Sequence, residues 1–178
     1  MAARALAIGA IVVGLFFEAS ATDAAPAFAD EFSSATLGPA WRARQGIWRV
    51  ADGHVAGRKD PMSKHPAKLD LLLPQGDGIL EFSFKTDRPG GVDVFFNRGD
   101  LRIAVVQLRA DGMAFATYPK TKDVPSEPTY LARSERKLDT NHWHHVRIER
   151  RDGCVWIRRG TIEVLEVCLL YTSPSPRD

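Results

Sequence analysis

The stretch Ile79-Leu80-Glu81-Phe82-Ser83-Phe84-Lys85 places apolar and polar side chains at alternate positions. Successive side chains of a β-strand point to opposite faces of a sheet, so Leu80, Phe82 and Phe84 share one face and the polar groups share the other. One face then belongs to a core and the other to water. The stretch predicts a half-buried strand of an antiparallel sheet.

Asp-Gly dipeptides separate similar runs elsewhere in the chain. Asp52-Gly53 separates Ile47–Val50 from His54–Ala56, Asp111-Gly112 separates Ile103–Arg109 from Met113–Tyr118, and Asp152-Gly153 separates Trp143–Arg150 from Cys154–Ile157. Two-residue hairpin turns need positive φ angles, which Gly adopts without steric cost.

Further strands are expected at Lys68–Leu73, Gly91–Asn97 and Ile162–Val167, which makes about ten in all. No long segment has helical periodicity, and residues 119–128 are typical of a loop. The sequence therefore predicts an all-β fold, an antiparallel two-sheet β-sandwich of the jelly-roll class.

The first 21 residues predict a signal peptide. Arg4 precedes an apolar run from Ala5 to Phe17, and Ala19-Ser20-Ala21 supplies the small residues that a signal peptidase needs. A run of about 13 apolar residues is too short to cross a hydrocarbon core. We expect export to the periplasm or the extracellular space, a linker over residues 22–27 and no membrane span after signal removal.

The last residues, 168–178, resemble a translated sequencing adapter, so we expect a non-native tail there. The jelly-roll domain would then cover residues 28–167, be truncated at its C-terminus and lack its last strand or strands. Exported proteins often pair their cysteines, but with Cys168 in the tail Cys154 stands alone. We expect no native disulfide.

Composition and charge indicate a soluble domain and exclude a dedicated nucleic-acid binder. The chain has 178 residues, of which 44% are hydrophobic and 26% charged, and its formal net charge is +2. These values are typical of a soluble domain, and the weak charge does not fit a nucleic-acid binder.

Two regions resemble a known family. Phe28-Ala29-Asp30-Glu31-Phe32, Trp41, Gly46–Val50 and Asp52–Gly57 resemble the opening of bacterial 3-keto-disaccharide hydrolase-like domains, and Leu138–Ile148 resembles a laminin G segment. These are secreted jelly rolls of the concanavalin A-like class. The resemblance implies that fold, a carbohydrate ligand and, as an alternative, hydrolase or lyase activity on 3-keto-disaccharides. Trp41 and Trp48 are expected to be core residues.

No metal site is predicted. His142, His144 and His145 form a cluster, but on a strand the first two share one face and the third takes the other. Calcium has candidate ligands in Asp60, Asp70 and Asp123, although the sequence contains no oxygen-ligand loop pattern. We expect no cofactor.

Glycoside hydrolysis needs two carboxyl groups across a cleft. Jelly-roll laminarinases carry them on one strand as Glu-x-Asp-x-x-Glu. This chain lacks the pattern, because the residue two positions after Glu81 is Ser83 and the residue two positions after Asp93 is Phe95. Glu81, Asp93 and Glu149 remain as candidates for a carboxylate base that removes a proton next to a ketone. Whether the protein is an enzyme stays open.

The predicted water-facing positions could instead hold a sugar. They comprise Glu81, Lys85, Asp93, Asn97, Gln107, Arg109, Arg147, Glu149 and Trp156, of which Asp93, Asn97, Gln107, Arg147 and Trp156 are the predicted carbohydrate-binding residues. We expect a secreted carbohydrate-binding or accessory domain with a glycan as its partner. The alternatives are a 3-keto-glycoside hydrolase or lyase and a structural protein-interaction module of the cell envelope.

Overall fold

A computed structural model describes residues 12–16, 28–72, 76–87, 89–99, 101–119 and 127–168. These residues form fourteen strands and no helix, and every strand pairing is antiparallel. The predicted all-β fold class is confirmed. Nothing in the described part of the chain forms a helix with the length and apolar character needed to cross a membrane.

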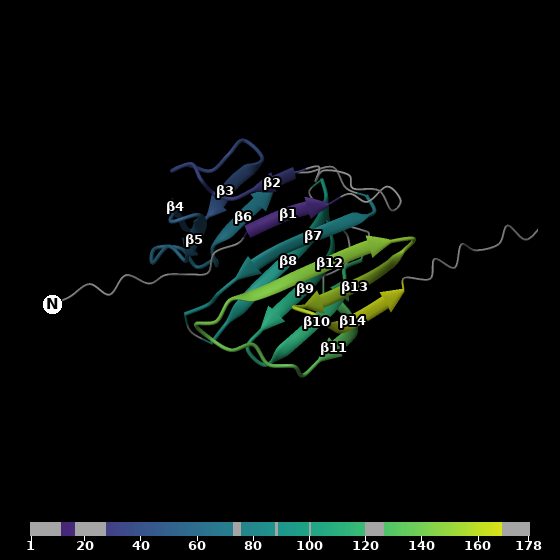
Figure 1. Cartoon of the computed structure of the whole chain (residues 1–178). Helices are drawn as coiled ribbons and strands as arrows, with labels where there is room; N and C mark the ends of the chain where they lie inside the picture. Colours follow the sequence, from purple (N-terminus) through teal and green to yellow (C-terminus); the bar gives the residue numbers. More distant parts are fainter. Residues whose placement is uncertain are drawn as a thin grey trace, which may run out of the picture.

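The strands form two stacked sheets and two short ribbons (Figure 1). The six-stranded sheet has the order β14 (Ile162–Cys168), β13 (Cys154–Arg159), β12 (His144–Arg151), β7 (Gly78–Phe84), β1 (Val12–Phe16) and β2 (Phe28–Asp30). The four-stranded sheet has the order β11 (Thr129–Ser134), β10 (Gly112–Thr117), β9 (Leu101–Arg109) and β8 (Gly91–Arg98). The ribbons pair β3 (Trp41–Gln45) with β6 (Lys68–Leu71) and β4 (Ile47–Ala51) with β5 (His54–Arg58).

The core lies between the two sheets. Phe82, Phe84 and Ile148 come from the six-stranded sheet, and Leu108 and Phe115 come from the four-stranded sheet; all are buried in one cluster. Leu80 is partly buried against the same cluster, as its alternation with Phe82 and Phe84 predicts. The half-buried strand at Ile79–Lys85 is therefore confirmed, although Ile79 on the other face is also buried.

The N-terminal tryptophans anchor the ribbons to this core. Trp41 is buried, stacks against Phe32 at a centroid distance of 5.5 Å, and donates from Nε1 to Asp30 Oδ2 at 2.8 Å. Trp48 is partly buried against the core, directly over Gly57, where any Cβ would collide with the indole ring. Both tryptophans thus hold the ribbons in place, and their prediction as core residues is confirmed for Trp41 and partly for Trp48.

The expected hairpins are present. Asp52 and Gly53 have φ angles of 54° and 71°, and Asp152 and Gly153 have 52° and 76°. Positive φ at both central residues is the type I′ geometry that fits the twist of a hairpin. All ten strands expected from the sequence are observed, and four others, β1, β2, β3 and β11, were not expected.

Strand β1 lies inside the predicted signal peptide. It pairs with β7 over five positions and with β2 over three. The other residues of the segment 1–21, and the expected linker 22–27, lie outside the described residues. Residues 12–16 of the predicted signal peptide therefore form a strand between β7 and β2 in the six-stranded sheet.

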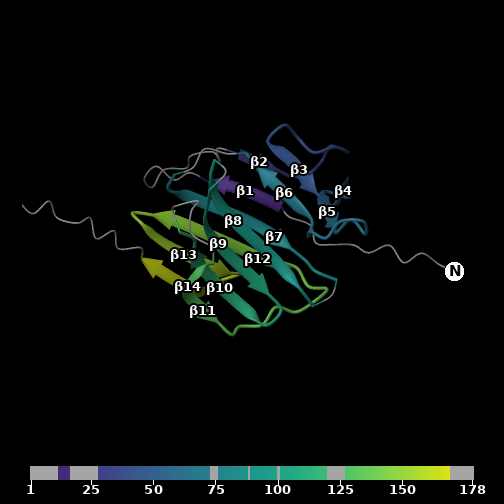
Figure 2. The ribbon, with the colours of Figure 1, turned by 180° about the vertical axis from the view of Figure 1, so that it is seen from behind.

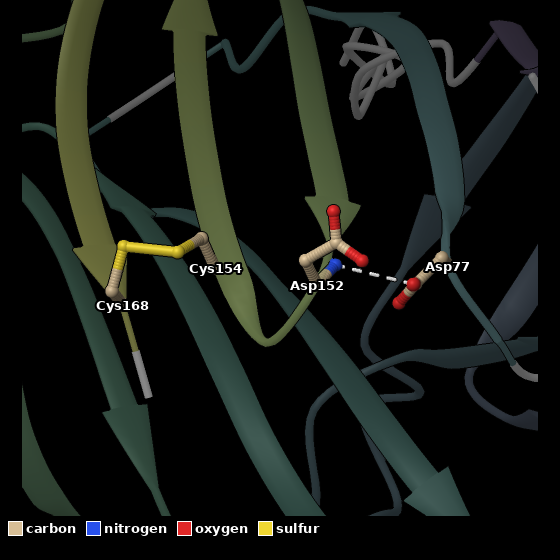
Figure 3. Close-up of a disulfide and its surroundings, with 4 residues drawn as sticks. All are labelled: Asp77, Asp152, Cys154 and Cys168. Atoms are coloured by element: carbon tan, nitrogen blue, oxygen red, sulfur yellow. Dashed lines mark hydrogen bonds between the residues drawn. A yellow bond between two sulfur atoms is a disulfide. The ribbon is translucent and has the colours of Figure 1, made fainter. Parts of the chain in front are cut away.

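The chain forms a disulfide between Cys154 and Cys168, so the prediction of no disulfide is wrong for this structure (Figure 3). Strand β14 continues to Cys168 and places it directly opposite Cys154 on β13. Figure 3 also shows the β12–β13 turn held by a hydrogen bond of 3.2 Å from the Asp152 amide to Asp77 Oδ2. Residues 169–178 of the expected tail lie outside the described residues.

Candidate functional site

The predicted carbohydrate-binding residues divide between the two outer faces of the sandwich. Asp93 and Asn97 on β8 and Gln107 on β9 belong to the four-stranded sheet, whereas Arg147 on β12 and Trp156 on β13 belong to the six-stranded sheet. The two sheets are separate layers in both views (Figures 1 and 2), so these five residues do not form one site. Each group is described in turn.

On the four-stranded sheet, Asp93 lies opposite Gln107 across the β8–β9 pairing, on the face away from the core. Asp93 Oδ2 forms an ion pair with Arg109, a residue two positions further along β9. The other oxygen, Oδ1, is buried and has no hydrogen-bond partner among the described residues. Burial raises the pKa of Asp93 and outweighs the opposing effect of Arg109 and Arg102.

A tyrosine adjoins this pair. The Tyr130 hydroxyl on β11 donates to Gln107 Oε1 at 3.1 Å, and the Arg133 guanidinium lies 4.0 Å from the centre of the Tyr130 ring. Tyr130 keeps 39% of its surface exposed. Sequence reasoning missed Tyr130 and Arg133 because β11 was not expected. The apolar and aromatic run at 130–132 after Pro128 was the signal available.

Asn97 lies apart from this group. It is four residues from Asp93 on the same strand, about 13 Å at the usual rise of a strand. A bulge follows Phe96, and Asn97 pairs with Arg102. The Arg102 guanidinium stacks 4.0 Å from the centre of the Phe95 ring, so the surroundings of Asn97 are cationic and aromatic. We define the binding face as Asp93, Gln107, Arg109, Tyr130 and Arg133, without Asn97.

The outer face of the six-stranded sheet is organised around one arginine. Arg147 Nη1 donates to Glu81 Oε1 at 2.9 Å, and Nη2 donates to Glu149 Oε2 at 3.3 Å. Partial burial acts to lower the pKa of Arg147, but the hydrogen bonds and charges of the two glutamates outweigh it and raise that pKa. Both carboxylates are thus already partnered by the same cation.

The remaining aromatic candidate, Trp156, is half-buried on that face and lies opposite Glu149. The Arg151 guanidinium is 5.8 Å from the centre of its ring. Of the candidate catalytic residues, Glu81 and Glu149 therefore share one face and Asp93 lies on the other. No pair that combines Asp93 with either glutamate can flank one substrate.

The histidines bind the protein's own backbone and side chains. His144 Nε2 donates to the Asp139 carbonyl at 2.8 Å, His142 Nδ1 to the Thr140 carbonyl at 3.1 Å, and His145 Nδ1 is 3.3 Å from Ser83 Oγ. The part of the chain that the structure describes contains no group of three or more His, Cys, Asp or Glu side chains that could hold a metal ion.

The candidate calcium ligands lie in different surroundings. Asp60 Oδ1 accepts from the Met62 amide at 2.9 Å, and Asp70 forms ion pairs with Arg44 at 3.1 Å and Lys68 at 3.5 Å. Asp123 lies outside the described residues. The two described aspartates are thus occupied by an amide donor and by cations.

Comparisons with known proteins give a fold likeness only. No family model and no curated protein matches the sequence. A similar solved structure is the carbohydrate-binding module CBM66 from Bacillus subtilis, with a TM-score of 0.47 and 16% sequence identity over 72% of this chain and 79% of that chain. At these values the likeness assigns neither a family nor a ligand to this chain.

Proposed function

We propose that this chain is an exported domain that binds carbohydrate through the binding face on the four-stranded sheet. The proposal rests on the residues of that face, which combine a carboxylate, a side-chain amide, two guanidinium groups and an exposed tyrosine ring. Sugars present hydroxyl groups at their edges and C–H groups on their faces. Polar groups that fix orientation beside an aromatic surface are the usual components of a small-ligand site.

One observation carries the proposal: the free oxygen of Asp93. A buried polar atom without a partner is costly, and native proteins pair the great majority of such atoms. Asp93 Oδ1 is buried without a partner while Oδ2 is held by Arg109, so the carboxylate is fixed with one acceptor unused. A sugar hydroxyl that displaces the groups covering Oδ1 and donates to it would satisfy it.

Gln107 and Tyr130 extend the same surface. Gln107 Oε1 accepts from Tyr130, which leaves the Gln107 amide group as a donor toward a ligand oxygen. Donor and acceptor groups then lie side by side on β9 and β8, opposite each other in register. This spacing suits two adjacent hydroxyl groups of one sugar ring.

The test is to titrate the protein with a panel of glycans and to measure the heat of binding by calorimetry. We expect dissociation constants in the millimolar to micromolar range. Asp93→Ala and Gln107→Ala should each weaken binding about tenfold or more, because each removes a hydrogen bond to the ligand. Asn97→Ala should have a much smaller effect.

Glu149→Gln is the matched control, because it changes a carboxylate on the opposite face. Unchanged affinity in Asp93→Ala and Gln107→Ala, or a loss of affinity in Glu149→Gln, would show that the binding face is assigned to the wrong sheet. Export is tested separately by N-terminal sequencing of the secreted protein, which should begin near residue 22.

A second candidate function, cleavage of 3-keto-glycosides, is favoured by the same aspartate. A raised pKa makes the Asp93 carboxylate a stronger base, and Oδ1 has no competing donor. The carboxylate would take the proton from the carbon next to the ketone, and the electron pair would form the enolate. The enolate electrons would then form a double bond to the anomeric carbon as the glycosidic C–O bond breaks, and the leaving oxygen would take the proton back from Asp93. Turnover of a 3-keto-disaccharide that is lost in Asp93→Asn but kept in Glu149→Gln would support this reaction. Absence of turnover by the unaltered protein would exclude it.

A further inference from the structure

The two ribbons carry a concentrated positive charge. The segment Trp41–Asp70 contains seven basic and three acidic residues, a net charge of +4, although the whole chain has only +2. The ribbons lie together at one end of the sandwich in both views (Figures 1 and 2). The charge of the molecule is therefore collected at this end.

Five basic side chains of this segment form no ion pair with a described residue: the strand residues Arg42, Arg49 and Arg58, and Lys59 and Lys64 in the loop after β5. Arg42, Arg49 and Arg58 are exposed and form no ion pair with any residue that the structure describes. Alternation places them on the outer faces of the ribbons, because their neighbours Trp41, Trp48 and Gly57 face the core. Arg44, in contrast, is already paired with Asp70.

Exposed apolar side chains accompany these arginines. Ile47 is 41% exposed and lies directly opposite Arg58 in the β4–β5 register. Leu72, which follows β6, is 57% exposed, and Met62, in the loop between β5 and β6, is 92% exposed. Single exposed apolar residues are ordinary, and of these three Ile47 is the one that the strand register places directly opposite an unpaired arginine.

The two ribbons contact each other at Gly46. Gly46, between β3 and β4, has a φ of +88°, and a Cβ at this position would come within 2.7 Å of the Arg58 carbonyl oxygen and 2.6 Å of Ala67 Cβ. The backbone of β3–β6 and that of β4–β5 therefore pack against each other at this point. We call Arg42, Arg49 and Arg58 with Ile47, Met62 and Leu72 the ribbon surface.

We infer that the ribbon surface docks on an anionic lipid membrane. Peripheral binding to a bilayer combines basic side chains that meet anionic headgroups with apolar side chains that enter the interface. The ribbon surface has both components, whereas a soluble polyanion would need only the cations. The exposed apolar side chains thus favour a lipid surface over an acidic polysaccharide or a nucleic acid. This inference does not depend on the binding face of the four-stranded sheet.

The test measures binding of the full chain to vesicles of phosphatidylcholine with and without phosphatidylglycerol, by flotation. Each basic residue near an anionic surface contributes about 1 kcal/mol, so Arg42→Gln, Arg49→Gln and Arg58→Gln together should weaken binding to the anionic vesicles about 100-fold. Ile47→Ser, Met62→Ser and Leu72→Ser together should weaken it at least about tenfold through lost apolar burial. Both triple variants should unfold at the temperature of the unaltered chain, since these side chains are exposed.

The matched control is Arg98→Gln, Arg136→Gln and Lys137→Gln, which removes the same charge from exposed positions outside the ribbons. We expect it to bind nearly as well as the unaltered chain. Equal losses in this control and in the arginine variant would mean that net charge alone drives binding, and the inference would be wrong. It would also be overturned if polygalacturonate or DNA bound with loss in the arginine variant and no loss in the serine variant.

Discussion

Replacing Asp93 by Asn should change how the stability of the protein depends on pH. Because burial raises the pKa of Asp93, the folded state holds the proton more tightly than the unfolded state does. Stability from this group is therefore fully present at pH values below its unfolded pKa of about 3.9, and it is lost as the pH rises through the folded pKa. Within that window the loss cannot exceed about 1.4 kcal/mol per pH unit, because a single proton is involved.

Urea unfolding from pH 3 to pH 8 measures the effect, with the unaltered chain and Asp93→Asn compared at each pH. The difference in unfolding free energy should move in favour of the variant as the pH rises and become constant above the folded pKa. Asn keeps an oxygen that can accept from Arg109, so this hydrogen bond can be kept although the ion pair is lost. A difference that is flat across the range, or that moves in favour of the unaltered chain, would refute the account of Asp93 as a desolvated carboxylate.

Three further predictions concern the fold. Asp30→Ala should lower the unfolding free energy by about 3 kcal/mol, and Asp30→Asn should lower it by less, in urea titrations of both variants. The reason is that the carboxylate accepts from the Trp41 indole at 2.8 Å and from the Phe32 amide. Reduction of the Cys154–Cys168 disulfide should cost up to about 3 kcal/mol, as expected for a loop with a sequence separation of 14, and reduction should have no effect in Cys154→Ser. A chain that begins at residue 22 lacks β1 and exposes the edges of β7 and β2, so it should self-associate in analytical ultracentrifugation; a stable monomer would contradict this.

The sequence predicted most of the strands because turns and alternating side chains are determined by residues that are neighbours in the chain. Asp52-Gly53 and Asp152-Gly153 adopt positive φ at both positions, which the dipeptides themselves favour. The missed strands have weaker patterns. Strand β2 has only three residues, and in β3 all residues after Trp41 are exposed, so neither alternates visibly. Their positions are set by contacts with partners far away in the chain.

The site was harder to predict than the fold, since alternation gives the face of a strand but not the sheet to which the strand belongs. Asp93 and Arg147 were both correctly placed on water-facing sides, yet they lie on opposite outer faces. Tyr130 joins Gln107 only through the pairing of β11 with β10, a contact between segments separated along the chain. Disulfide formation depends in the same way on the register of β13 with β14.

The difference between the two faces follows from how each arginine is shared. Arg147 lies between Glu81 and Glu149 and donates one Nη group to each carboxylate, whereas its Nε is buried without a hydrogen-bond partner among the described residues. Among the described residues, Arg109 pairs with Asp93 through Oδ2, and Oδ1 is buried without a partner. A sheet face can bind a hydroxyl-rich ligand where its polar groups keep unused hydrogen-bonding capacity, because only then does the ligand replace a deficit instead of an existing bond. In the described part of the chain, each face has one buried group without a partner, a carboxylate acceptor at Asp93 and a guanidinium donor at Arg147, and the Gln107 amide beside the acceptor leads us to expect the ligand on the four-stranded sheet. Gln107→Arg, which supplies Asp93 with a second cation, should weaken binding more than Gln107→Ala does, without unfolding the protein.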